Sequence, residues 1–252
     1  ITAMAIAKQL GIFREGNTVI EGNELHAMPD EALDEKVKTT TVFARVSPTD
    51  KLRIIQSLKR IGEVAAMTGD GVNDSPALKA ADIGVAMGQS GTDVAKDAAD
   101  VILLDDNFTT IEYAIREGRR VYRNIQKVIQ FLLAGNIAEI LVLFIATVLN
   151  WEPPILAVHI LLINLATDSL PAIALGVDPA DANIMHEPPV RSGTLFERGL
   201  IRRVILHGLF IAGSTMAAYL IGQRQAGYTA GVTMAFCVLA ISQLFHSLNQ
   251  RS

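Results

Sequence analysis

The feature that most constrains the fold is an almost unbroken apolar run from Val128 to Leu149. A run of that length can cross the hydrocarbon core of a bilayer, which is about 30 Å thick. Further runs of similar character lie at 155–177, 200–222 and 228–248. Because backbone polar groups inside a bilayer must be satisfied internally, each run is expected to be a helix. Residues 119–252 are therefore predicted to form an all-α transmembrane bundle of four helices.

Charged side chains are concentrated in the first half of the chain. The 252 residues are 50% hydrophobic and 19% charged, with a mean hydropathy of +0.33. Asp, Glu, Lys and Arg are dense up to about Lys127 and sparse inside the later apolar runs. This mixture predicts a soluble part, residues 1–118, joined to the membrane part. The net charge of -4 gives no reason to expect nucleic acid as a partner.

Two further features concern processing and redox chemistry. The segment Ile1 to Lys8 does not open on a start methionine and has no basic segment before an apolar core. We therefore expect no signal peptide, and a chain cut from a longer polypeptide. The one cysteine, Cys237, lies in an apolar run, so an internal disulfide is excluded and a packing role is expected.

Short helices and strands alternate through the soluble part. The patterns predict helices at 2–10, 30–38 and 76–81, and strands at 17–22, 41–44, 63–66, 82–88 and 101–104. A further helix should begin after Ser47, because serine caps helices well, Pro48 suits the first helical position and Asp50 adds an acid to the first turn. This alternation predicts an α/β fold with a Rossmann-like parallel sheet. Ser90-Gly91-Thr92 lacks the glycine spacing and lysine of a P-loop, so a structural role is expected.

The stretch from Met67 to Asp74 carries the densest chemistry of the soluble part. It follows the predicted strand at 63–66, and ligands in α/β sheets sit where strands end. Asp70 and Asp74 are separated by a glycine that lets the backbone turn sharply and approach a ligand. Paired carboxylates suit a hard divalent cation such as Mg²⁺. An ordinary Asp/Asn/Gly turn is the alternative interpretation.

The string Met67-Thr68-Gly69-Asp70-Gly71-Val72-Asn73-Asp74, with Ser75-Pro76-Ala77-Leu78-Lys79 after it, resembles the hinge motif of P-type cation-transporting ATPases. The phosphorylation domain of that family is an α/β Rossmann-like haloacid-dehalogenase-type domain. The resemblance implies that Asp70 coordinates a Mg²⁺ that bridges to the phosphoryl group, that Asp74 supports this site, and that Asn73 touches the phosphate.

Lys51 lies in the first turn of the helix that follows Ser47. A lysine there is mildly unfavourable with the helix dipole and calls for a partner. The resemblance to P-type ATPases covers this segment and implies that Lys51 neutralises an aspartyl phosphate. A solvated surface lysine is the alternative.

The join between the two parts is basic, with Arg116, Arg119, Arg120, Arg123 and Lys127. A helix from Thr109 to Arg116 is expected to end near Gly118. If one helix covers 119–149 it is about 46 Å long at 1.5 Å per residue, and it would project from the membrane into the soluble part.

Loop charges predict the orientation in the membrane. The loop 178–199 contains Arg191 and Arg198, and Arg202 and Arg203 begin the next span. The loops at 150–154 and 223–227 hold little positive charge. By the positive-inside rule the soluble part, the loop 178–199 and the carboxyl end are predicted to be cytoplasmic.

Polar residues inside the predicted spans indicate a cation site. They are Asn136 and Glu139 in the first span and Asn164, Thr167 and Asp168 in the second. Within each span they are expected to share a helix face. An ionisable residue deep in a membrane is costly and marks a pathway or site. Pro171 removes the backbone hydrogen bond to the Thr167 carbonyl, which frees an oxygen. Such oxygens suit a hard cation, and an interhelical polar clamp is the alternative.

These span motifs, Asn136-Ile137-Ala138-Glu139 and Asn164 through Ala172, resemble the fifth and sixth membrane helices of calcium-pump-type ATPases. Sodium/potassium pumps usually carry aspartate where this chain has Asn164, which favours Ca²⁺ as the transported ion. Gln243 matches an eighth-helix position that is glutamate in two-site calcium pumps. The amide there leaves a second ion site, and the stoichiometry, open.

The resemblance implies the carboxyl-terminal part of an ATP-driven calcium pump that uses Mg²⁺ and ATP. The family's phosphorylated aspartate and its nucleotide-binding domain are missing from this chain, so it is expected to be inactive alone. Its expected partners are the lipid bilayer, the missing amino-terminal portion and the transported cation. A pump for Mn²⁺ or Na⁺, a membrane-anchored phosphatase and a non-catalytic scaffold derived from a pump remain alternatives.

Overall fold

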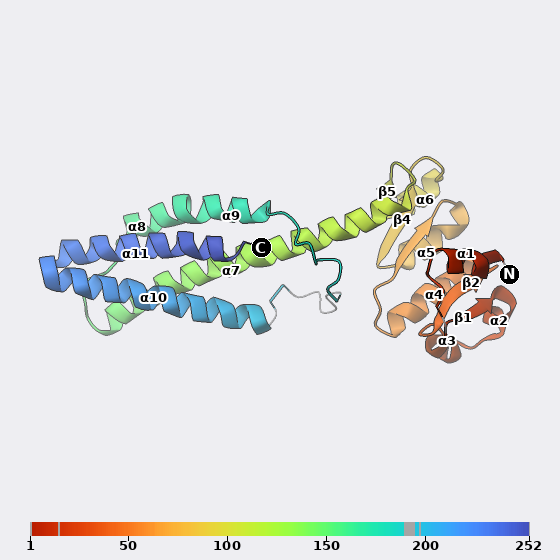
Figure 1. Cartoon of the computed structure of the whole chain (residues 1–252), viewed down its shortest axis with the longest axis horizontal. Coiled ribbons are helices and arrows are strands. Elements are labelled where there is room, and N and C mark those ends of the chain that lie inside the picture. Colours follow the sequence, from red (N-terminus) through yellow and green to blue (C-terminus); the bar gives the residue numbers. More distant parts are fainter. Residues whose placement is uncertain (1, 15, 189–194, 197, 252) are drawn as a thin grey trace. The chain divides into compact units, whose positions relative to one another are not determined.

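A computed structural model describes residues 2–14, 16–188, 195–196 and 198–251 (Figure 1). The chain divides into two compact units, Ile1–Glu112 and Tyr113–Ser252. The boundary predicted at residue 118 lies a little further along the chain. Each unit has its own core, so the two are described separately.

The first unit alternates helices and strands, as the sequence predicts. Its strands are β1 (Thr18–Glu21), β2 (Thr40–Ala44), β3 (Ala66–Gly69), β4 (Ile83–Met87) and β5 (Val101–Leu103). Its helices are α1 (Thr2–Gln9), α2 (Gly22–Ala27), α3 (Asp30–Lys36), α4 (Pro48–Arg60), the 3₁₀ turn η1 (Val72–Asp74), α5 (Ser75–Ala80) and α6 (Asp93–Ala98). The sequence patterns missed α2 and α6, which are short.

The strands form two parallel sheets, whereas the sequence predicted one. The larger has the order β3-β4-β5 and the smaller pairs β1 with β2. Among the described residues, β2 and β3 each have one paired neighbour, so no strand joins the two sheets.

The strand predicted at 63–66 is misplaced. β3 begins at Ala66, and Val64 is 68% exposed. Thr68 and Gly69 pair with Val85 and Ala86 instead. Apolar character marked the wrong residues because backbone pairing with β4 determines where β3 lies.

Helix α4 begins where the sequence predicts. The Ser47 backbone N–H donates to Asp50 Oδ2 over 3.0 Å, and the Asp50 N–H donates to Ser47 Oγ over 3.2 Å. This capping box satisfies two N–H groups that would otherwise lack partners. Ile54 and Leu58 on α4 then pack against a buried cluster that includes Ile20.

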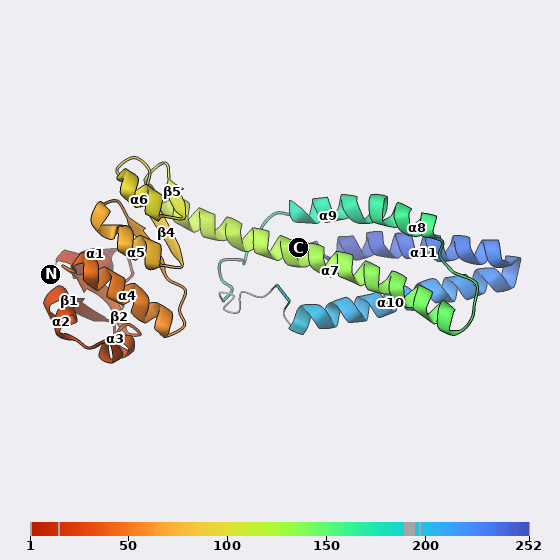
Figure 2. The same ribbon diagram turned by 180° about the vertical axis from the view of Figure 1, so that it is seen from behind.

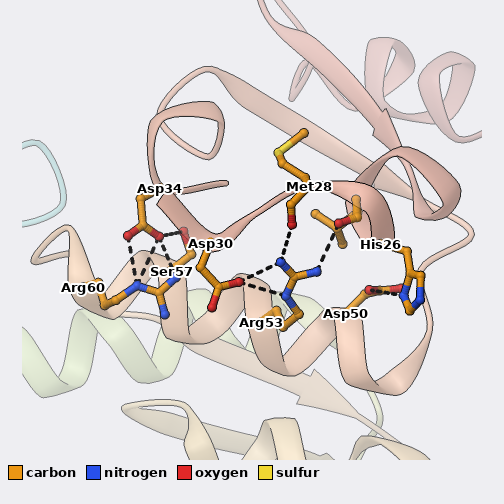
Figure 3. A network of polar contacts seen from close by, with 9 residues as sticks. His26, Met28, Asp30, Asp34, Asp50, Arg53, Ser57 and Arg60 are labelled. Atoms are coloured by element: carbon orange, nitrogen blue, oxygen red, sulfur yellow. Dashed lines mark hydrogen bonds and ion pairs between the residues drawn. The ribbon is translucent and has the colours of Figure 1, made fainter. Parts of the chain in front are cut away.

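Arg53 ties α4 to the segment between α2 and α3 (Figure 3). Its Nη2 donates to the Met28 carbonyl over 2.6 Å and its Nη1 to the Leu25 carbonyl over 3.1 Å. Its Nε and Nη2 both reach Asp30 Oδ1. About two turns further along, Arg60 donates to both carboxylate oxygens of Asp34. The planar fork of arginine allows such multiple contacts.

We expect Arg53→Lys to destabilise α4 by about 1–3 kcal/mol, because a lysine cannot supply donors to both carbonyls and the carboxylate. Hydrogen exchange of the α4 amides in the full-length protein measures the free energy of this local opening. Arg60→Lys is the matched control and should cost less, since the Arg60 side chain is 41% exposed, against 21% for Arg53, and its described contacts are with one carboxylate and no backbone carbonyl. Equal protection losses in both variants would contradict the role assigned to the carbonyl contacts.

The second unit is helical. Its elements are α7 (Phe108–Val148, which starts in the first unit), α8 (Ala157–Leu162), the π-helix η2 (Ile163–Asp168), α9 (Ser169–Gly176), α10 (Arg198–Ala226) and α11 (Tyr228–Asn249). In the described residues, four helices are long and apolar enough to cross a membrane, with α8, η2 and α9 forming one of them. Each of the four predicted spans coincides with one of these helices.

Two predicted helix ends are wrong. α7 continues through Gly118 without a break and is 41 residues long, so no separate helix ends near Gly118 or begins at 119. A glycine at an exposed helix position costs only about 1 kcal/mol, which the flanking residues of a long helix offset. α10 continues to Ala226, so the loop predicted at 223–227 reduces to Gly227, whose φ of 85° suits glycine.

Close glycine contacts set the helix packing. Figures 1 and 2 both show α10 beside α11. A Cβ on Gly222 would lie 2.8 Å from the Ala230 carbonyl oxygen, and one on Gly231 would lie 2.9 Å from that of Tyr219. A Cβ on Gly208 would lie 2.8 Å from Ile137 of α7. Small residues thus let the helix backbones approach, as is usual between membrane helices.

Candidate functional sites

The first candidate site is a cavity of about 410 Å³ in the first unit, at the ends of β3 and β4. It is lined by Lys51, Thr68, Gly69, Asp70, Asp74, Met87, Ser90, Asp106 and Phe108. Three of the four residues proposed from sequence for phosphoryl chemistry therefore meet here. They come from α4 and from the segment that follows β3.

Lys51 and Asp74 form an ion pair in this cavity, with 2.6 Å between Lys51 Nζ and Asp74 Oδ1. Asp74 is buried, whereas Asp70 is exposed to the cavity. A Cβ on Gly69 would lie 2.6 Å from Asp74 Cβ, so only glycine leaves room for this carboxylate. Since Lys51 contacts a buried acid, the alternative of a freely solvated lysine is not what the structure shows.

Asn73 is exposed on η1 and, among the described residues, is absent from the lining of the cavity. Asn73 is close to Asp70 and Asp74 in sequence, but its side chain does not line the described cavity. Its predicted contact with a phosphate stays a prediction.

The second candidate site is a polar cluster inside the helical unit. Glu139 of α7, Asp168 of η2 and Gln243 of α11 are 5%, 4% and 1% exposed. Gln243 Nε2 donates to Glu139 Oε1 over 3.4 Å, and Thr167 Oγ1 donates to Gln243 Oε1 over 3.5 Å. Both hydrogen bonds are long, so they hold the side-chain oxygens of the cluster only loosely.

Asp168 makes this cluster more than a polar clamp. Its buried Oδ2 has no hydrogen-bond partner among the described residues. A buried carboxylate oxygen without a donor is costly and requires a proton or a cation. Carboxylate, amide and hydroxyl oxygens from three helices are the donor set that a hard cation takes.

Local helix geometry shapes this site. Residues Ile163–Asp168 form a π-helix, a geometry that is frequent at functional sites, and Pro171 follows within one turn. The single hydrogen of the Thr167 hydroxyl is shared between the Ile163 carbonyl oxygen, 2.8 Å from Oγ1, and Gln243 Oε1, 3.5 Å from Oγ1. A Cβ on Gly135 would lie 2.8 Å from Gln243 Nε2, so glycine there makes room for the amide.

Asn136 and Asn164 are not brought into the cluster. Both are exposed, on α7 and on the π-helix, and neither lies on the buried side with its partner carboxylate. The three-residue spacing of Asn136 and Glu139 rotates their side chains by about 60° around the helix, enough to separate a buried from an exposed position. The two asparagines thus differ in burial from their partner carboxylates, and their part in a cation site stays a prediction.

Comparison with known proteins shows which proteins this chain is similar to. A model described as cation transporting ATPase, C-terminus, matches residues 152–252, and two haloacid dehalogenase-like hydrolase models match residues 1–82 and 52–115. Over its whole length the chain is 46% identical to calcium-transporting ATPase 1 of Bacillus cereus, 44% to the calcium-transporting ATPase of Bacillus subtilis and 42% to calcium-transporting ATPase type 2C member 1 of Homo sapiens.

Residues 152–252 thus match the carboxyl-terminal domain of cation transporting ATPases, and the whole chain is similar to one part of these calcium-transporting ATPases. It spans 30%, 28% and 28% of the length of those three relatives. The predicted fold class is confirmed, since a haloacid dehalogenase-like domain with parallel sheets precedes four helices able to cross a membrane.

Sequence reasoning missed Asp106, which also lines the first cavity. Its carboxylate accepts the backbone N–H groups of Gly88, Gln89 and Ser90 over 2.6, 2.9 and 2.8 Å, and the Ser90 hydroxyl over 2.7 Å. These donors, led by the Gln89 N–H, lower the pKa of Asp106 to about 2. The available signal was its place after β5, because the carboxyl ends of parallel strands meet at one edge.

The segment 90–92 has the structural role that its sequence suggests. The Thr92 N–H donates to the Asp70 carbonyl oxygen over 2.8 Å, and Thr92 Oγ1 caps α6 by accepting from the Ala95 N–H. The loop held by Asp106 thereby fixes the backbone of Asp70, which lines the same cavity.

We expect the loop at 88–90 to be protected by ionised Asp106. Because its pKa is lowered on folding, this stabilisation is fully present above the ordinary pKa near 3.8 and is lost as pH falls through about 2. Hydrogen exchange of the 88–90 amides, measured from pH 5 to pH 2, should show protection falling across that window. Asp106→Asn should abolish the pH dependence, while Asp105→Asn should retain the drop near pH 2.

Proposed function

We propose that this chain is the carboxyl-terminal part of an ATP-driven cation pump, most simply one that transports Ca²⁺. The observation that carries the proposal is the pair of buried carboxylates, Glu139 and Asp168, inside helices that can span a membrane. Three relatives with calcium transport in their names match the whole chain at 42–46% identity. Clustered buried acids within membrane spans are not expected of an anchored phosphatase.

The cavity at β3 is proposed as the phosphoryl-transfer site of the full-length protein. Asp70, exposed to the cavity, would hold Mg²⁺ with support from Asp74, since carboxylates are the ligands that this ion prefers. The bound ion supplies charge neutralisation for phosphoryl transfer from ATP. Lys51, held by Asp74, would present its ammonium to the phosphorylated group, and Asn73 would contact the phosphate from η1.

The cluster in the helical unit is proposed as the transport site. Glu139, Asp168, Thr167 and Gln243 would bind the cation, with the unpartnered Asp168 oxygen as a principal ligand. Asn136 and Asn164 stay proposed ligands. Because both asparagines are exposed, they would bind the cation only if other helices of the full-length protein cover them and extend the site to their side.

Coupling between the two processes is proposed to pass along α7. This helix begins at Phe108, which lines the first cavity, and it carries Glu139 in its apolar part. A shift of α7 would move Glu139 relative to Asp168 and change the affinity for the cation.

The soluble unit is proposed to be cytoplasmic. Arg202 and Arg203 lie at the start of α10, on the side of the span that the positive-inside rule assigns to the cytoplasm. Arg191, which the prediction also used, lies outside the described residues, and the side chain of Arg198 is not described.

Mg-ATP-dependent ⁴⁵Ca²⁺ uptake by vesicles that contain the full-length protein tests this function. Uptake that requires ATP, with little inhibition by Na⁺, supports a calcium pump. Uptake of ⁵⁴Mn²⁺ in place of Ca²⁺, or ATPase activity stimulated by Na⁺ alone, would support the assignment as a pump but show that the transported ion is not Ca²⁺. Absence of any cation-dependent ATP hydrolysis would favour a scaffold derived from a pump.

A further inference from the structure

A polar cavity of about 490 Å³ lies among α7, α10 and α11, apart from both sites above. Arg123 and Lys127 line it from α7, Arg203 and His207 from α10, and Asn249 from the end of α11. All of its described lining residues are polar, and none of them is a carboxylate. The cavity is therefore suited to an anion rather than to a second cation.

Nearby acids that do not line the cavity hold two of its cationic side chains in position. Lys127 Nζ lies 2.9 Å from Asp178 Oδ2, and Arg123 contacts the carboxylate of Glu187. Arg203 has a neutral described partner instead, since its Nε donates to Gln130 Oε1 over 2.9 Å. Among the described residues that line the cavity, no acid offsets the positive charge of Arg203.

A second cavity, of about 310 Å³, shares His207 and Asn249 with the first. Its lining includes Phe210 and Phe245, which are 77% and 63% exposed. Phe210 follows His207 into the apolar part of α10, and Phe245 precedes Asn249 on α11. Along α10 the lining changes from cationic at Arg203 to aromatic at Phe210, and along α11 it changes from the amide of Asn249 to the aromatic ring of Phe245.

We propose that these two cavities bind one anionic phospholipid of the bilayer. Its phosphate would lie among Arg203, Lys127 and Arg123, and an acyl chain would run over Phe210 and Phe245. Basic pockets between membrane helices bind such head groups, and the adjoining aromatic surface matches the chain of an amphiphile but not a free phosphate ion. The buried His207 Nδ1, which has no hydrogen-bond partner among the described residues, lies at the junction of the two cavities.

Native mass spectrometry of the detergent-solubilised full-length protein tests the head group. We expect phosphatidylglycerol to bind more tightly than phosphatidylcholine, and Arg203→Gln to weaken phosphatidylglycerol about fivefold, the effect of one cation near an anionic lipid. Arg202→Gln removes the same charge from the next residue, which does not line the described cavity, and should change binding less than twofold. Equal losses in the two variants would overturn the site.

Three further measurements separate the source of the phosphate and guard against misfolding. Phe210→Ser should weaken long-chain phosphatidylglycerol and leave the dihexanoyl form unchanged, whereas Phe144→Ser, on an exposed part of α7, should affect neither. Displacement of the long-chain lipid by millimolar inorganic phosphate would show a small-anion site and overturn the lipid assignment. Gln126→Glu adds an acid to the cavity and should weaken the lipid at least as much as Arg203→Gln, and unchanged binding would overturn the proposal.

Discussion

Replacing Asp168 by asparagine is expected to weaken cation binding about 100-fold and to abolish ATP-dependent ⁴⁵Ca²⁺ uptake at micromolar Ca²⁺. Asp168 is 4% exposed and its Oδ2 has no described partner, so a bound cation would offset a buried charge that no described donor stabilises. Removing one member of a buried charge pair typically costs about 3–5 kcal/mol, of which about 2.7 kcal/mol already amounts to 100-fold in affinity. Asparagine keeps the size of the side chain and removes the charge.

The measurement is ⁴⁵Ca²⁺ binding and uptake by the full-length protein in vesicles, with Glu139→Gln and Glu152→Gln beside Asp168→Asn. Glu139→Gln should also reduce affinity, since its Oε1 faces the same amide of Gln243. Glu152 is exposed in the segment between α7 and α8, so its amide variant should transport normally. Wild-type affinity in Asp168→Asn would remove this residue from the transport site.

Replacing Asp70 by asparagine is expected to lower phosphoenzyme formation from ATP by at least about 100-fold in the full-length protein, the scale seen when one charge-stabilising group is lost from a reaction site. Asp70 is the exposed carboxylate of the cavity, whereas Asp74 is buried against Lys51, 2.6 Å away. The Asp70 side chain is thus free to bind a divalent ion, and its loss should raise the Mg²⁺ concentration needed for half-maximal phosphorylation.

Incorporation of ³²P from ATP, titrated with Mg²⁺, measures this effect. Asp93→Asn is the matched control, because Asp93 is an exposed acid in the first turn of α6 outside the described lining of the cavity. Its phosphorylation should match the wild type. An unchanged Mg²⁺ requirement in Asp70→Asn would show that the ion is held elsewhere. Since ⁴⁵Ca²⁺ binding without ATP does not use this cavity, it should survive in Asp70→Asn and separate the two sites.

Local sequence patterns determined much of the fold. Ser47, Pro48 and Asp50 specified the start of α4, because a capping box depends on residues three apart in the chain. The apolar runs specified the four spans, since length and hydropathy alone decide whether a helix can cross a bilayer. Strand and helix ends were less well predicted at Ala66 and Gly118, where pairing and helix continuity outweigh local preference.

Only the tertiary structure decided which polar groups meet. Gln243 and Glu139 are 104 residues apart in sequence, and packing of α11 against α7 brings them into contact. The same packing leaves Asn136 and Asn164 exposed, although sequence spacing grouped them with the carboxylates. Lys51 meets Asp74, and Asp106 meets the loop at 88–90, because separate elements converge at one edge of the sheet. The sequence thus determined which chemical groups are present and which helices carry them, whereas long-range packing selected the groups that can act together.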